Sequence, residues 1–132
     1  MFRSINNRSG KFAKTVGGNC NSSHLVYAAE CVKHDQLCIG FTTRPLHMRF
    51  NNHRSDINTK DMSCELVKHF VNSNCNFDND LKLYILQKNL PPDLNICKFY
   101  EDRWISRLDT RSPNGMNVLL NDYSQLYFKI FK

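Results

Sequence analysis

The chain has 132 residues, the length of a single domain of about 100–200 residues, and with 41% hydrophobic residues it can bury a core. It carries 18 Lys and Arg and 12 Asp and Glu, and the whole excess of six positive charges falls in residues 1–60. This imbalance favours a polyanionic partner such as nucleic acid, with a solvated basic face as the alternative. The longest apolar run, residues 25–29, is far short of the roughly 20 residues that span a bilayer, so no membrane association is expected.

The cysteines and the first residues bear on the compartment. The first twelve residues contain no apolar stretch of the kind that a secretory signal requires, so the six cysteines are not expected to form a disulfide framework. We expect reduced thiols, some of them metal ligands, in a cytosolic or nuclear protein.

The first half of the chain predicts a hairpin, two strands and a helix. Residues 8–18 are punctuated by glycine and predict a hairpin arm. Residues 24–30 and 36–42 are β-prone and are joined by a polar turn, which predicts two antiparallel strands. A helix is expected to begin near Thr43, with Pro45 in its first turn, where proline is tolerated.

The second half adds shorter elements. Residues 61–71 have apolar residues at helical spacing and predict a second helix, and residues 72–80 are typical of a polar loop. We expect a strand over residues 81–86, a third helix over residues 98–109 and an extended segment over residues 116–120. The sum is an α/β (α+β) domain with a small, mainly antiparallel three-stranded sheet flanked by helices. Its regions are an N-terminal basic arm or hairpin (1–23), a central domain (24–120) and a C-terminal tail (121–132).

Three groups of residues stand out for their chemistry. Tyr27 lies on the first predicted strand, and Gly40 follows thirteen residues later on the second. Arg49 and His53 are four residues apart and therefore lie on one helix face. Glu101 precedes apolar residues at i+3, i+4 and i+7, which puts its carboxylate beside an apolar stripe, where it is unfavourable unless it is paired or binds a cation. The alternative is a first-turn glutamate that satisfies free backbone N–H groups.

In this order and at these intervals, the three groups resemble the GIY-YIG endonuclease family. The first family motif corresponds to Leu25-Val26-Tyr27 and the second to Cys38-Ile39-Gly40, and the Arg, the His, the Glu and a late Asn, Asn117, follow in family order. The chain departs from the family at Cys38, where the second motif has a tyrosine, so one catalytic hydroxyl is missing. The similarity is greatest to the endonuclease domain of Penelope-like retroelements, over about residues 2–117, in FRSINNRSGKF, NCNSSHLVYAAEC, IGFTTRPLHMRFNNHRSDI, VKHF and EDRWISRLDTRSPNGMN.

The resemblance implies divalent-metal-dependent hydrolysis of DNA phosphodiester bonds. Glu101 would hold one Mg²⁺ or Mn²⁺, whose charge would offset that on the phosphoryl oxygens. Arg49 would clamp the scissile phosphate, and Tyr27, assisted by His53, would orient or deprotonate the attacking water. Asn117 would hold the substrate or a metal-bound water.

The same resemblance implies a structural zinc site. Penelope-like nucleases carry Cys-x-x-Cys between the two motifs and two histidines downstream. Here the two pairs are Cys31-x-x-His34 and His69-x5-Cys75, which exchange one Cys and one His and keep two of each. This donor set suits tetrahedral Zn²⁺, and the alternative is a set of unconnected thiols and histidines in loops.

We therefore expect a DNA endonuclease that nicks target DNA in the nucleus and supplies a 3′-hydroxyl primer to a reverse transcriptase domain of the same polyprotein. One alternative is a domesticated, catalytically weakened DNA-binding module, suggested by Cys38, and another is a zinc-only interaction domain. Basic residues of the first half are expected to contact DNA phosphates, namely Lys11, Lys14, Arg44 and Arg54.

Overall fold

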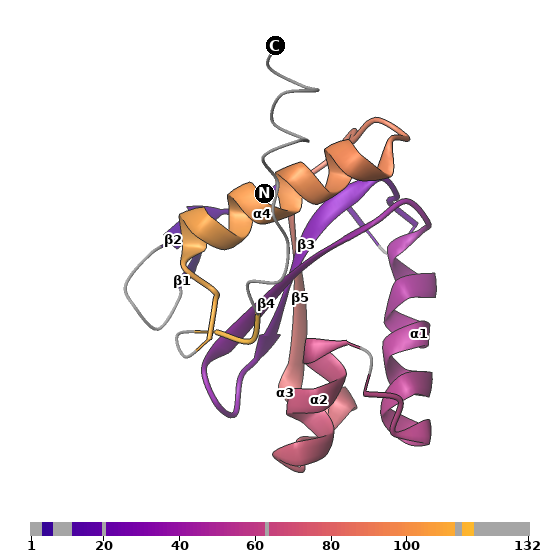
Figure 1. Cartoon of the computed structure of the whole chain (residues 1–132), viewed down its shortest axis with the longest axis vertical. Coiled ribbons are helices and arrows are strands. Elements are labelled where there is room, and N and C mark those ends of the chain that lie inside the picture. The colour runs from indigo at the N-terminus through magenta and orange to yellow at the C-terminus, as the bar shows by residue number, and fades with distance from the viewer. Residues whose placement is uncertain (1–3, 7–11, 20, 63, 113–114, 118–132) are drawn as a thin grey trace.

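The centre of the molecule is a three-stranded antiparallel sheet in the order β4-β3-β5 (Figure 1). The computed structural model describes residues 4–6, 12–19, 21–62, 64–112 and 115–117. The strands are β3 (Leu25–Cys31), β4 (Gln36–Thr42) and β5 (Leu81–Gln87). These bounds confirm the predicted α+β class and the three predicted strands to within a residue or two.

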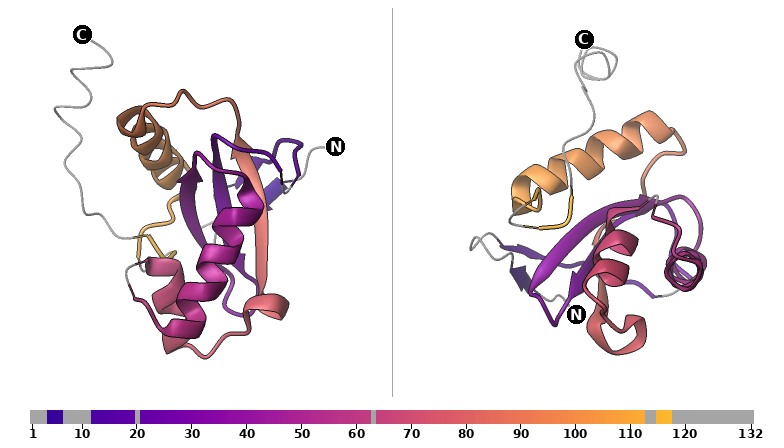
Figure 2. Two further views of the ribbon diagram at one scale, coloured as in Figure 1. Left: turned by 90° about the vertical axis from the view of Figure 1, so that its right-hand side faces the viewer. Right: turned by 60° about the horizontal axis from the view of Figure 1, so that its bottom comes forward.

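The central strand β3 is buried on both faces, and its alternation divides the core into two layers. One face of β3 packs in a cluster with the helices that follow β4, through Leu25, Tyr27, Ala29 and Cys31. The other face packs in a second cluster, through Val26 and Ala28. Figure 2 shows the last helix on one side of the sheet and the two helices that follow β4 on the other. A strand covered in this way is apolar at almost every position, as β3 is.

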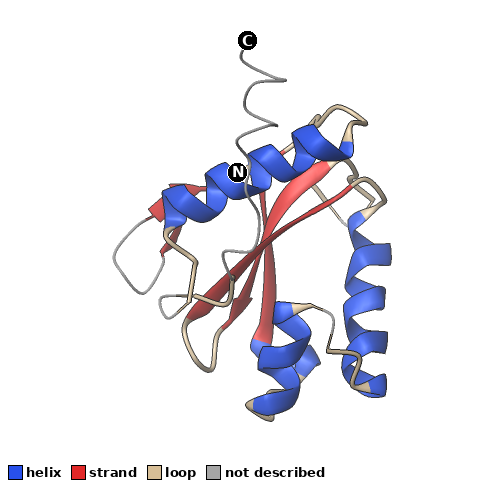
Figure 3. Cartoon of the chain, viewed as in Figure 1, coloured by secondary structure: helices blue, strands red, loops and turns tan. Residues whose placement is uncertain are grey.

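Four helices cover the sheet, and Figure 3 shows them arranged around the strands. They are α1 (Leu46–Thr59), α2 (Glu65–Asn72), α3 (Phe77–Asp80) and α4 (Leu94–Leu108).

Four helix predictions need correction. Helix α2 begins four residues later than the predicted 61–71, at Glu65 after the cap residue Cys64. Helix α1 begins after Pro45, which occupies the N-cap position rather than the first turn. The segment predicted as a polar loop contains α3, whose cap residue Asn76 accepts hydrogen bonds from two backbone N–H groups. Helix α4 begins four residues earlier than predicted, because the Asp93 side chain caps it by accepting from the backbone N–H groups of Asn95 at 2.9 Å and Ile96 at 3.4 Å.

The N-terminal hairpin is formed by β1 (Ser4–Asn6) and β2 (Phe12–Lys14), paired antiparallel, so it begins before the predicted stretch of residues 8–18. The segment after it contacts the main sheet, since the backbone N–H of Val16 donates to the carbonyl of Ile85 at 2.9 Å. The predicted tail (121–132) and most of the predicted extended segment lie outside the described residues.

The turn that follows α4 returns to the sheet at one glycine. A Cβ on Gly115 would lie 2.4 Å from the carbonyl oxygen of Thr110 and 2.8 Å from that of Leu37, so only glycine fits there. The next residue, Met116, donates its backbone N–H to Leu37 O at 2.9 Å and adds its side chain to the core. This contact joins the turn after α4 to the edge of β4.

Candidate active site

All six residues predicted to be catalytic line one cavity of about 490 Å³ beside β4, between α1 and α4. A volume of this size is typical of sites that enclose a small ligand or a part of a polymer. The residues come from separate stretches of the chain, which the sheet and the helices bring together: Tyr27, Cys38, Arg49, His53, Glu101 and Asn117.

The side chain of Tyr27 reaches this cavity because its partner on β4 is a glycine. Tyr27 and Gly40 are directly opposite in the β3–β4 register. A Cβ on Gly40 would lie 2.6 Å from both Cζ and Oη of Tyr27, closer than atoms can approach. The glycine therefore lets the phenol ring lie across the neighbouring strand and point at α1.

The phenol oxygen of Tyr27 contacts the two helix residues predicted to assist it. It lies 2.9 Å from Nε2 of His53 and accepts a hydrogen bond from Nε of Arg49 at 3.3 Å. Burial raises the pKa of Tyr27 above its ordinary value in spite of the Arg49 charge, so the phenol is protonated at neutral pH.

His53 is 1% exposed, and burial, with a smaller effect of the Arg49 charge, lowers its pKa to about 4. It is therefore a neutral imidazole at pH 7. Its Nδ1 has no hydrogen-bond partner among the described residues, so the contact with Tyr27 is the polar contact that orients the ring.

Glu101 presents a half-buried carboxylate from α4 to the cavity, as its helical spacing predicts. Burial raises the pKa of Glu101 to about 7; the charges of Lys98 and Arg49 and a hydrogen bond with the backbone of Phe41 oppose this shift, and the charge of Asp102 adds to it. No ion pair within 4 Å joins Glu101 in the described part of the chain, whose three ion pairs involve other acids. A carboxylate without an ion pair in this setting is suited to hold a divalent cation.

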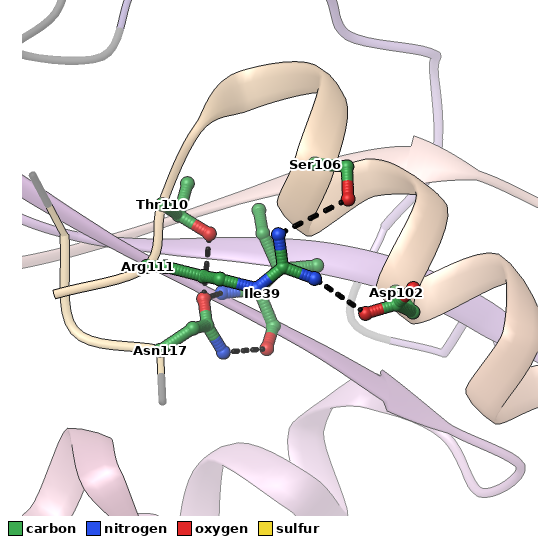
Figure 4. A network of polar contacts seen from close by, with 6 residues as sticks. All are labelled: Ile39, Asp102, Ser106, Thr110, Arg111 and Asn117. Carbon is green, nitrogen blue, oxygen red and sulfur yellow. Dashed lines mark hydrogen bonds and ion pairs between the residues drawn. The ribbon is translucent and has the colours of Figure 1, made fainter. Parts of the chain in front are cut away.

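Asp102, the residue after Glu101 on α4, is held in an ion pair. Its carboxylate lies 2.9 Å from Nη2 of Arg111, and Nη1 of the same guanidinium donates to Oγ of Ser106 at 3.3 Å (Figure 4). The turn after α4 brings Arg111 back beside the helix. The helical repeat of α4 does not predict this contact, because Arg111 lies beyond the end of the helix. Both charged groups line the cavity.

Asn117 lines the cavity and also has a structural role, while its contact with substrate or a metal-bound water stays a prediction. Its Oδ1 accepts from the backbone N–H of Ile39 at 2.8 Å and from Oγ1 of Thr110 at 2.7 Å, and its Nδ2 donates to the carbonyl of Ile39 at 3.0 Å (Figure 4). The amide thus fixes the turn after α4 to β4, and it is 8% exposed. Asn117 is therefore a positioning residue for the wall that carries Cys38 and Gly40.

Cys38 takes the place of the second motif tyrosine and lies against the same cavity, with 8% of its surface exposed. Burial, with the nearby acidic groups, raises the pKa of its thiol well above the ordinary value, so the group is neutral. A neutral thiol is a weak hydrogen-bond donor and cannot replace a phenol.

The four predicted DNA-binding residues fall into different settings. Arg44 is exposed at the edge of the cavity, where its guanidinium can meet a phosphate. Arg54 pairs with Asp78 at 2.8 Å and lies over the rings of Phe50 and Phe77, so its guanidinium joins α1 to α3, and its contact with DNA stays a prediction. Lys11 and the side chain of Lys14 lie outside the described residues.

Several other residues line the cavity and were not predicted, because no sequence motif identifies them as part of a site. They reach the cavity through the start of α2, one face of α1 and the turns before α1 and after α4, and they are Thr43, Asn52, Cys64, Glu65 and Arg111.

The two predicted metal-binding pairs converge on one point at the end of the sheet. Cys31 ends β3, His34 lies in the β3–β4 turn, His69 is on α2, and Cys75 follows α2. Their ligand atoms all lie within 4.8 Å of one another, and this group could hold a metal ion.

Four of the six distances between these donor atoms agree with ligands of a single metal ion, and the others are within 4.8 Å. The Sγ of Cys75 is 3.6 Å from Sγ of Cys31, 3.3 Å from Nδ1 of His34 and 3.8 Å from Nε2 of His69, and Cys31 Sγ is 3.4 Å from His34 Nδ1. Metal–sulfur bonds of about 2.3 Å and metal–nitrogen bonds of about 2.0–2.1 Å separate tetrahedral ligands by about 3.3–3.8 Å. Within each cysteine–histidine pair, the sulfur and nitrogen atoms are therefore as far apart as two ligands of one metal ion.

Comparison of the chain with models of protein families, with curated proteins and with solved structures finds no match. Within the described residues, no helix has the length and apolar character needed to cross a membrane.

Proposed function

We propose that the chain is a GIY-YIG-like, divalent-metal-dependent DNA endonuclease of the kind found in Penelope-like retroelements. The observation that carries this proposal is the contact of Tyr27 with His53 and Arg49 in the cavity that also receives Glu101. Its role would be to nick target DNA in the nucleus, so that the 3′-hydroxyl primes a reverse transcriptase domain of the same polyprotein.

The chain's own groups would handle the attacking water as a relay. Because Arg49 donates to the Tyr27 oxygen, the phenol hydrogen can point either to Nε2 of His53 or into the cavity. A neutral His53 can accept this proton while Tyr27 takes one from water, so the proton passes from water to Nε2 and the phenol remains neutral. The other N–H groups of the Arg49 guanidinium would bind the phosphate whose ester bond breaks.

Glu101 would hold the catalytic cation, Mg²⁺ or Mn²⁺. Its carboxylate has no ion-pair partner among the described residues, which fits a site completed by a metal. When bound, the cation supplies charge neutralisation for the phosphoryl oxygens and the leaving 3′ oxygen. Carboxylate coordination of this kind typically involves one or two acidic side chains.

The group Cys31, His34, His69 and Cys75 would hold structural Zn²⁺. Two thiolates and two imidazoles at tetrahedral spacing are the donors that this ion prefers. The ion would join the β3–β4 turn to α2 and so stabilise the packing of this helix against the end of the sheet.

A second candidate function is a DNA-binding module with little or no catalysis. The buried, neutral thiol of Cys38 favours it, because the family's second hydroxyl is missing from the cavity wall. Incubation of supercoiled plasmid with the protein, with and without Mg²⁺, separates the two functions. The endonuclease converts the plasmid to the nicked form only with Mg²⁺, whereas the binding module retards it in a gel and leaves it intact.

A further inference from the structure

Helix α4 has a second functional face, turned away from the cavity. At about 100° per residue, Tyr100, Arg103 and Arg107 lie on the side of the helix roughly opposite Glu101 and Asp102. This face borders a separate hollow of about 230 Å³, lined by Gln87, Tyr100, Arg103, Trp104 and Arg107. The hollow shares no lining residue with the cavity that contains Tyr27.

The lining of this hollow consists of two aromatic rings, two guanidinium groups and one amide, with no acidic residue. The Trp104 indole donates from Nε1 to Oε1 of Gln87 at 2.8 Å, which fixes the plane of the ring. The guanidinium carbon of Arg107 lies 4.9 Å from the centre of the same ring. Arg103 is exposed nearby, so one positive charge lies over the Trp104 ring and a second lies beside a rigid, half-buried aromatic pair that packs against the core.

We propose that this face of α4 binds single-stranded nucleic acid, with bases stacked on the Tyr100 and Trp104 side and phosphates held by Arg103 and Arg107. Planar rings with flanking arginines are the combination that such ligands use, since every base has a face to stack and every phosphate a charge to pair. The occupant is polyanionic because the lining carries positive charge without an acid to neutralise it. An acidic peptide would pair with the arginines and leave the rings unused, so the contribution of the rings separates these two ligands.

This inference is independent of the proposed endonuclease activity, because it concerns a different face and requires no metal. Trp104 is the only tryptophan of the chain, so the emission of the protein reports directly on the site. We would titrate the full chain, without divalent cation, with oligo(dT) of about eight nucleotides, a length within the usual site size. Inorganic polyphosphate, which has the charge but no bases, is the matched ligand.

The oligonucleotide should quench Trp104 emission and polyphosphate should not. Arg103→Gln combined with Arg107→Gln should lower the slope of log affinity against log salt by about 1.4, or about 0.7 for each single-strand phosphate that is no longer neutralised. Tyr100→Leu should weaken oligonucleotide binding about fivefold or more. The double variant Lys60→Gln, Lys82→Gln removes the same charge from exposed positions elsewhere and should behave like the unmodified chain in both respects.

Arg49→Gln locates the binding, since it removes the cavity's proposed phosphate contact and leaves this face intact. Unchanged quenching in Arg49→Gln supports the second site, and a loss of quenching there would assign the signal to the cavity and overturn the inference. Two further results would overturn it: no quenching by the oligonucleotide, or equal binding of polyphosphate with no effect of Tyr100→Leu. The last result would indicate an acidic-peptide surface.

Discussion

Glu101 is held in a setting that opposes its charge, and this should be visible in the stability of the protein. Its pKa of about 7 lies above the ordinary carboxyl value, so between these values the folded state binds more protons than the unfolded state. Its contribution to the free energy of unfolding is therefore largest in acid and is lost as the pH rises through 7. A residue that weakens the fold at neutral pH is expected where function requires its charge.

In the absence of metal, Glu101→Gln should raise the free energy of unfolding at pH 8 by about 1–2 kcal/mol, and the gain should shrink as the pH falls below 7 and vanish at about pH 4, below the ordinary carboxyl pKa. Urea denaturation of both proteins at the two pH values measures this difference. Equal stability of the variant and the unmodified protein at pH 8 would show that the carboxylate is well solvated.

Cys38 is the other residue whose substitution is informative. In the β3–β4 register it is opposite Ala29, a small residue, so the wall has room for a larger side chain that points into the cavity. Cys38→Tyr restores the family's hydroxyl and should cleave plasmid at least as fast as the unmodified chain. Cys38→Phe is the matched control, because it adds the ring without the hydroxyl and should not accelerate cleavage. If both variants cleave alike, the hydroxyl is not the limiting group.

At the scale of elements, the site depends on the close pairing of β3 and β4. Gly40→Ala would place a methyl group 2.6 Å from the Tyr27 ring, which must then move away from Arg49 and His53. We expect the free energy of unfolding to fall by about 1–3 kcal/mol and cleavage to fall with it. Gly17→Ala is the matched control, since a Cβ there meets no atom within 4 Å. Urea denaturation of the two variants gives the comparison, and a stable, active Gly40→Ala would mean that the ring does not occupy this position in solution.

Elements with a clear period could be predicted from the sequence, and short or non-local features could not. The strands β3, β4 and β5 and the apolar face of α2 have the expected spacing, so their positions agree with the structure. The four-residue helix α3 is too short to show a helical period and depends on the Asn76 cap.

The contacts of the candidate site likewise include some that were expected from the sequence and some that were not. The approach of Tyr27 to His53 was expected from the family resemblance, and it depends on the β3–β4 register that places Gly40 opposite Tyr27. The ion pair of Asp102 with Arg111 and the amide contacts of Asn117 depend on the path of the turn after α4, which no local pattern describes. The convergence of Cys31 and His34 with His69 and Cys75 was expected from the family resemblance, and it required the fold to bring α2 to the β3–β4 turn.

At the scale of the whole molecule, the Cys/His group should connect metal content to folding. Protein prepared without chelator should contain about one zinc ion per chain, and removal of the ion should lower the melting temperature by about 10 °C or more, because structural zinc contributes to folding free energy. Elemental analysis and thermal melting with a chelator measure the two quantities.

Replacement of Cys75 by Ser should abolish both the zinc content and the effect of the chelator. Cys64→Ser is the control, because this half-buried thiol lies outside the metal-binding group and the variant should keep its zinc. Absence of zinc from the unmodified protein, with an unaltered melting temperature in chelator, would refute the site.

The central claim is that the cavity hydrolyses DNA with a cation held by Glu101, and the nicking of supercoiled plasmid in Mg²⁺ by Glu101→Gln tests it most directly. Glu65→Gln is the matched control: Glu65 lines the same cavity and is already paired with Lys68 at 3.1 Å. We predict that Glu101→Gln loses nicking by a factor of about 10² or more, since several kcal/mol of charge stabilisation are removed, while it still retards DNA in a gel. Glu65→Gln should nick at nearly the unmodified rate. Nicking by Glu101→Gln at the unmodified rate, or no nicking by the unmodified chain in Mg²⁺, would contradict the account.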